Sequence, residues 1–154
     1  MRGSVLLLTG SLLFGAAALW ADQERPDLSG TWKLDQADAG LGQVNKDFLL
    51  VIDEKAGNIH IQETRGPRPK EDVSSLTCPL TGAECPMQDG TDKAKAFVYY
   101  NGPVLVLLKT HGRKGDSVEK DRLTLSESGK SLVLEIEHLD PAAKSEKLVL
   151  SKAQ

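Results

Sequence analysis

Apolar and polar residues alternate in short stretches along most of the chain, and this pattern predicts half-buried β-strands. In residues 58–63, for example, Ile59 and Ile61 alternate with polar residues. No stretch after the first 21 residues repeats apolar positions convincingly at the spacing of an amphipathic helix. We predict about nine strands, at residues 30–35, 47–53, 58–63, 73–77, 95–100, 104–111, 118–125, 131–139 and 145–151.

Turn-forming residues separate these segments. Asn101-Gly102 is a strong signal for a β-hairpin, and a glycine or proline recurs at 115, 129 and 141. An antiparallel series of strands must bury one face and protect two edges, and closure into a barrel does both. The sequence therefore predicts an all-β fold, an up-and-down antiparallel β-barrel of about 8–10 strands. A two-sheet sandwich is the main alternative.

The first 21 residues have the composition of a secretory signal peptide. Arg2 is followed by an apolar run from Val5 to Trp20, then by small residues and an abruptly polar segment. We expect cleavage after Ala21, with Ala18 as the alternative site. The apolar run, about 16 residues long, is shorter than a membrane span requires, so we expect no stable span after cleavage. Residues 22–154 would then form one secreted or periplasmic domain.

The two cysteines fit an oxidising compartment. Cys78 and Cys85 enclose a short segment that contains Pro79 and Gly82. We expect a disulfide that closes a surface loop. A metal site is disfavoured because a metal needs more ligands than two cysteines, and no histidine lies near them in sequence.

Charge and motifs exclude several classes of function. The net charge of −3 argues against binding to nucleic acid, which favours a basic surface. His60, His111 and His138 lie on three different predicted strands, and no metal-binding or catalytic motif includes them. Glu135 and Glu137 alternate with apolar residues, which places them on the outer face. We therefore predict no metal, no cofactor and no catalytic residue.

Two motifs resemble those of a known family. Residues 27–34 (DLSGTWKL) resemble the G-x-W first strand of the lipocalin and fatty-acid-binding superfamily. Residues 121–132 (DRLTLSESGKSL) are similar to a hairpin of small secreted bacterial lipocalin-like (calycin) proteins. The resemblance implies a barrel with an internal cavity, and a basic residue of the last strand packed across Trp32. No arginine follows Arg122, so Lys147 or Lys152 would take that place.

The predicted barrel favours binding of a small apolar ligand in its interior. The alternative is a protein-binding module, such as a periplasmic protease inhibitor that inserts the segment Asp22–Pro26 or the Cys78–Cys85 loop. An enzyme ranks last, and the sequence identifies no protein partner. A fold does not by itself fix a function. The candidate ligand-binding residues are the positions expected to face inward: Trp32, Leu123, Leu125, Leu132, Leu134, Ile136, His138, Leu148 and Leu150.

Overall fold

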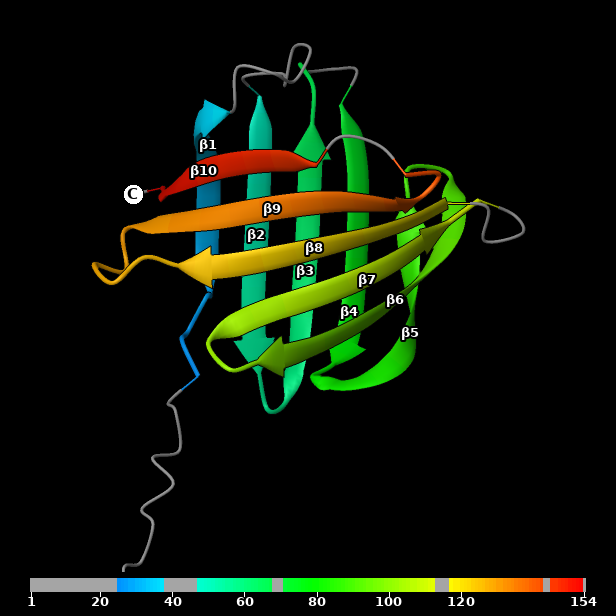
Figure 1. The fold of residues 1–154 in the computed structure, drawn as a ribbon, viewed down its shortest axis with the longest axis horizontal. Helices are drawn as coiled ribbons and strands as arrows, with labels where there is room; N and C mark the ends of the chain where they lie inside the picture. Colours follow the sequence, from blue (N-terminus) through cyan, green and yellow to red (C-terminus); the bar gives the residue numbers. More distant parts are fainter. Residues whose placement is uncertain (1–24, 38–46, 68–70, 113–116, 143–144, 154) are drawn as a thin grey trace, which may run out of the picture.

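The computed structural model describes residues 25–37, 47–67, 71–112, 117–142 and 145–153. These residues form ten strands that close into one barrel (Figure 1). The strands are β1 (Gly30–Ala37), β2 (Phe48–Lys55), β3 (Asn58–Arg65), β4 (Asp72–Pro79), β5 (Thr81–Asp89), β6 (Asp92–Asn101), β7 (Val104–His111), β8 (Ser117–Leu125), β9 (Ser131–Asp140) and β10 (Glu146–Lys152).

Each strand pairs antiparallel with its neighbour in sequence, and β1 closes the barrel by pairing with β10. Strands β7–β10 cross steeply in front of β1–β4 (Figure 1). The predicted up-and-down barrel is therefore confirmed, and the sandwich alternative is wrong. No helix long and apolar enough to cross a membrane occurs in the described part of the chain.

The predicted disulfide is present, but its predicted position in a surface loop is wrong. Cys78 lies in β4 and Cys85 in β5, with their Cα atoms 5.4 Å apart, and both are buried. Leu76 pairs with Met87, and the same register continued by two residues places the cysteines opposite each other. The Gly82 segment that indicated a loop is instead a bulge in β5, the strand missing from the prediction.

One end of the barrel is closed by a packed apolar core. Trp32 is fully buried, and its indole N–H donates a hydrogen bond to the carbonyl of Leu28 over 3.0 Å. The Lys152 Nζ lies 5.3 Å from the centre of the Trp32 ring, so Lys152 is the cation–π partner. Gly30 has a φ of 143°, a backbone conformation that residues with a side chain rarely adopt, which explains the glycine of the G-x-W motif.

Candidate ligand-binding site

The opposite end of the barrel is hollow. A cavity of about 740 Å³ lies where β3, β5 and β7 end and β4 begins, and we call it the cup. Its wall combines charged side chains with the apolar side chains of Val73 and Met87. The described residues that line it are Glu63, Arg65, Glu71, Asp72, Val73, Ser74, Met87, Asp89, Gly90, Thr91, Lys109, His111 and Glu119.

A buried ionic cluster forms the floor of the cup. Lys109 of β7 is 3% exposed, and its ammonium group contacts Asp121, Glu119 and Glu63. The Lys109 Nζ lies 3.0 Å from Glu119 and 3.5 Å from Glu63. Arg65 of β3 pairs with the second carboxylate oxygen of Glu63. The cluster of Glu63, Arg65, Lys109, Glu119 and Asp121 therefore joins β3, β7 and β8 across the barrel interior.

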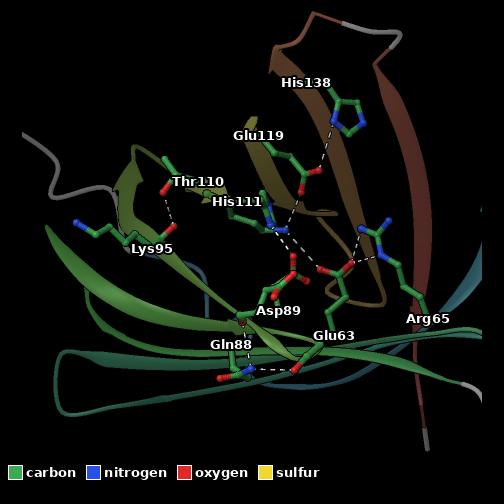
Figure 2. Close-up of polar contacts among 12 residues, drawn as sticks. Glu63, Arg65, Gln88, Asp89, Lys95, Thr110, His111, Glu119 and His138 are labelled. Atoms are coloured by element: carbon green, nitrogen blue, oxygen red, sulfur yellow. Dashed lines mark hydrogen bonds and ion pairs between the residues drawn. The ribbon is translucent and has the colours of Figure 1, made fainter. Parts of the chain in front are cut away.

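Two histidines extend this network toward the rim (Figure 2). The His111 Nδ1 lies 2.7 Å from an Asp89 carboxylate oxygen. The His138 Nδ1 lies 3.4 Å from Glu119, and its Nε2 lies 3.7 Å from Glu146. Glu119 thus links the central lysine to a histidine of β9. In the described ranges, no group of three His, Cys, Asp or Glu side chains is arranged to hold a metal ion.

The cluster shifts the pKa values of its members in opposite directions. Burial alone would lower the pKa of Lys109, but the surrounding carboxylates, Asp121 above all, raise it above its ordinary value. Burial also opposes ionisation of Glu63 and Glu119, yet the charge of Lys109 holds the pKa of both below the ordinary range. The cluster is therefore ionic at neutral pH in all but one member.

Asp121 is that member. Burial raises its pKa, the charge of Lys109 lowers it, and the charges of Glu119 and Glu63 raise it again, with a result of about 7. Its carboxylate bonds Lys109 through one oxygen, while the buried Oδ1 has no hydrogen-bond partner among the described residues. Asp121 therefore carries the proton that the cluster holds most readily.

Beneath the cup the barrel is almost filled by side chains. A small cavity of about 10 Å³, with room for one water-sized group, lies between Asp121 and the apolar core. It shares Glu63, Ser74, Met87 and Lys109 with the wall of the cup, so the two cavities adjoin. Its remaining lining is mostly apolar: Leu50, Ile61, Leu76, Leu107, Leu123 and Leu134.

Most of the predicted ligand-binding residues lie inside the barrel. Leu123 and Leu134 line the small cavity below the cup. Leu125 is only partly buried, and the His138 side chain is 29% exposed at the open end. That these residues contact a ligand remains a prediction. The other five are fully or almost fully buried in the core: Trp32, Leu132, Ile136, Leu148 and Leu150.

The sequence analysis missed the ionic cluster. Lys109 continues the inward alternation of Leu105 and Leu107, and Asp121 stands two residues before Leu123. Glu63 extends the inward series of β3 in the same way. The signal was available, because a charged residue at a position that should face inward marks a buried charge with partners on other strands.

The remaining polar candidates lie outside the barrel. His60 has the predicted outward orientation, and its Nδ1 lies 3.0 Å from the Thr77 hydroxyl. Glu135 and Glu137 also face outward, where they pair with Lys147 and Arg122. Lys147 therefore serves an outer ion pair and leaves Lys152 to cover Trp32.

Solved structures of other proteins share this architecture. A structure described as the REP1-NXSQ fatty acid transporter superimposes with a TM-score of 0.61 and 13% sequence identity, covering 83% of this chain and 97% of that one. The fold is a closed ten-stranded antiparallel barrel of calycin-like architecture. A secretory abundant heat soluble protein from Ramazzottius varieornatus matches with a TM-score of 0.63, 16% identity and coverage of 82% and 95%.

A third solved structure, that of Echinococcus granulosus fatty-acid-binding protein 1, matches with a TM-score of 0.58 and 11% identity, over 82% of this chain and 98% of that one. No protein-family model matches the sequence, and a search of curated proteins finds no match. At these identities the likeness establishes the fold alone, so the function must be argued from the cup.

Proposed function

We propose that this protein is a carrier that binds a small molecule in the cup, with the polar end of the ligand on the ionic cluster. The observation that carries the proposal is the contrast inside one barrel, which is filled at one end and hollow over about 740 Å³ at the other. Ligand cavities in proteins commonly measure roughly 300–1,000 Å³. The cup is thus large enough for a small organic molecule.

The chemistry of the wall supports an amphipathic ligand. Val73 and Met87 offer apolar contacts, and Met87 also reaches the small cavity below. Lys109, Glu63 and Glu119 place fixed charges on the floor. A few polar groups in a partly apolar cavity orient a ligand and provide specificity. The fatty-acid names of two similar structures agree with an apolar ligand body.

The protease-inhibitor alternative has less support. Pro26 accepts a hydrogen bond from the Tyr100 hydroxyl at 3.2 Å, and the Arg25 guanidinium lies 5.6 Å from the centre of the Tyr100 ring. Cys78 and Cys85 are buried within the barrel wall. The described parts of both candidate elements therefore pack on the barrel, while residues 22–24 lie outside the described residues.

Mass spectrometry of the protein purified from its native compartment tests the proposal. Under native conditions we expect a species heavier than the bare chain, and the extra mass should leave on denaturation. The difference between the two masses gives the ligand class. A bare protein in repeated preparations, together with no binding of apolar probes added in solution, would contradict a carrier.

A variant that fills the cup tests the location of the ligand, and a variant with the same substitution outside the cup is its matched control. Ser74 lines both the cup and the small cavity below it, so we expect Ser74→Trp to block the ligand. Thr124→Trp adds the same side chain to an exposed position of β8 and should leave binding intact. Equal loss of binding in both variants would place the ligand elsewhere.

We also propose that the chain is exported and that residues 1–21 are removed. The support is the charged, apolar and small-residue order of this segment, together with the disulfide between Cys78 and Cys85. The denatured mass should correspond to a chain that begins at Asp22, or at Leu19 if cleavage follows Ala18. An intact mass that includes Met1 would contradict cleavage.

A further inference from the structure

The ionic cluster contains more negative than positive groups. Glu63, Glu119 and Asp121 supply three carboxylates, whereas Lys109 and Arg65 supply two cations. The wall of the cup shows the same excess, because five carboxylates line it beside those two basic side chains and His111. When Asp121 is ionised, a further positive charge would balance the cluster, and a further negative charge would add to the repulsion.

Lys109 has no donor to spare for an anionic ligand. An ammonium group has three N–H donors, and Lys109 faces three carboxylates. Two of the Arg65 nitrogens are directed at one oxygen of Glu63. A ligand carboxylate at Lys109 would have to compete with the internal carboxylates that already surround it. Arg65 has N–H groups beyond those directed at Glu63, but a carboxylate bound there would lie beside the acidic side chains of the wall.

Two buried side-chain atoms of the described residues have no hydrogen-bond partner, His111 Nε2 in the wall of the cup and Asp121 Oδ1 below its floor, and the Asp121 oxygen is the stronger acceptor. Asp121 is 2% exposed, and its Oδ1 has no hydrogen-bond partner among the described residues. Asp121 lines the small cavity of about 10 Å³, which adjoins the floor of the cup at Glu63 and Ser74. An ammonium group is about the size of a water molecule, so this cavity has room for one.

We propose that the ligand carries a cationic head group, a protonated amine, which enters beside Asp121 as the third cation of the cluster while its apolar body occupies the cup. This inference rests on the proposed carrier function and names the chemistry of its ligand. Asp121 accepts a hydrogen bond from the ammonium through Oδ1 and keeps Lys109 on its other oxygen. Fatty acids are then poor ligands, although fatty-acid-binding proteins share the fold.

The titration of the cluster agrees with this assignment. The groups that face Asp121 are Lys109 from β7, Glu119 from its own strand, and Glu63 and Arg65 from β3. Farther out, His138 and His111 act on Glu119. With a pKa of about 7, Asp121 holds a proton in much of the protein near neutral pH. A bound ammonium group would replace that proton, so binding should release protons below pH 7.

Three probes with the same alkyl chain test the head group: decylamine and decanoate, each below its micelle concentration, and decanol, below its solubility limit. Calorimetry should show decylamine binding at least tenfold more tightly than decanol, with decanoate weakest. Binding of decanol or decanoate as tight as that of decylamine would overturn the cationic head but leave the carrier intact. Failure of all three to bind would overturn both proposals.

A variant that removes the charge of Asp121 tests whether this residue causes the preference for an amine. Asp121→Asn should reduce the affinity for decylamine at least tenfold and change the affinity for decanol less than twofold. Glu135→Gln removes one carboxylate from an outer ion pair with Lys147 and should change neither affinity. If Glu135→Gln weakens decylamine as much as Asp121→Asn does, the preference comes from the overall charge and the assignment is wrong.

Proton release gives a second readout that needs no variant. Calorimetry of the wild-type protein at pH 6, in buffers of different ionisation enthalpy, should show that decylamine releases protons and decanol does not. The affinity for decylamine should also rise between pH 5 and 7.5. Binding of decylamine without proton release would place the amine away from Asp121 and overturn the assignment.

Discussion

The two ends of this barrel are built from the same strands but differ in what fills them. At the closed end, Trp32 and Leu28 are fully buried, and Lys152 covers the indole ring from outside the core. At the open end, Lys109 and Asp121 are as inaccessible as most core residues, yet they are charged or titratable. The closed end is stabilised by apolar burial, and the open end keeps charges inside at the cost of desolvation.

This difference separates stability from function within one domain. A buried ion cluster stabilises a fold weakly, because desolvation offsets much of the attraction between the charges. Apolar side chains at the open end would have avoided this desolvation cost. The cup and the incompletely paired Asp121 are the observations on which the proposed ligand site at the open end rests. If that proposal holds, variants of the two ends should behave differently.

The largest effect is expected at the closed end. Trp32→Ala removes a fully buried ring and its hydrogen bond to Leu28, and should lower the free energy of unfolding by about 3–5 kcal/mol. Chemical denaturation checks this value. Trp32→Phe, which keeps an aromatic ring, should lose less. Ligand affinity in the folded fraction should stay unchanged, and a selective loss of affinity would mean that the closed end takes part in binding.

At the open end, Lys109→Met leaves three carboxylates around an apolar side chain. We expect the free energy of unfolding to fall by about 3 kcal/mol at pH 8, because removal of the lysine leaves buried carboxylates without a compensating charge. Below pH 5 the loss should shrink, because the carboxylates then take up protons. Denaturation curves at both pH values measure the difference. A loss that is the same at both would show that Lys109 acts through packing alone.

Substitution of Asp121, unlike that of Lys109, should make the folded protein more stable at high pH. Its pKa in the folded protein, about 7, lies above the ordinary value of 3.8, so the folded state binds the proton more tightly than the unfolded chain. Stability from this group is therefore complete below pH 4 and declines as the pH rises to 7, by up to about 1.4 kcal/mol per pH unit. Asp121→Asn should flatten this decline and make the protein more stable than wild type at pH 8.

The difference between the Asp121→Asn and wild-type curves from pH 5 to 8 isolates this effect, because Glu63 and Glu119 have lowered pKa values and stay ionised, and the same histidines are present in both proteins. Glu135→Gln, on the outer face, serves as the control and should follow the wild-type curve. Parallel curves for Asp121→Asn and wild type would mean that Asp121 is ionised throughout. Greater stability with weaker decylamine binding is the trade-off expected of a functional site.

The fold could be predicted because its signals are local. Alternation in segments such as Ile59–Ile61 fixes which face is buried, and Asn101-Gly102 fixes a hairpin. Strand β5 was missed because Pro79, Gly82 and Pro86 indicate a loop locally. The pairing of β5 with both neighbouring strands, β4 and β6, and the disulfide to β4 outweigh that local signal.

The site could be predicted only in part, because it depends on contacts between distant strands. The inward orientation of Leu123 and Leu134 follows from alternation and is observed. Lys109 and Glu63 are 46 residues apart in sequence, and no local pattern indicates that they meet. Alternation also does not predict that one end of the barrel is filled and the other hollow. That difference depends on how the side chains of all ten strands meet once the barrel closes.

The smallest effect is expected where the closed end meets solvent. Lys152→Met keeps most of the aliphatic chain over Trp32 but removes the ammonium group 5.3 Å from the ring centre. Since the lysine is exposed, the loss should be only about 0.5–1 kcal/mol, measurable by denaturation. Lys147→Met, which breaks an outer ion pair with Glu135, is the matched control. If high salt abolishes the loss of stability equally in both variants, the effect comes from general surface charge. If Lys152→Met alone loses stability and the loss persists in high salt, the cation–π contact with Trp32 stabilises the closed end.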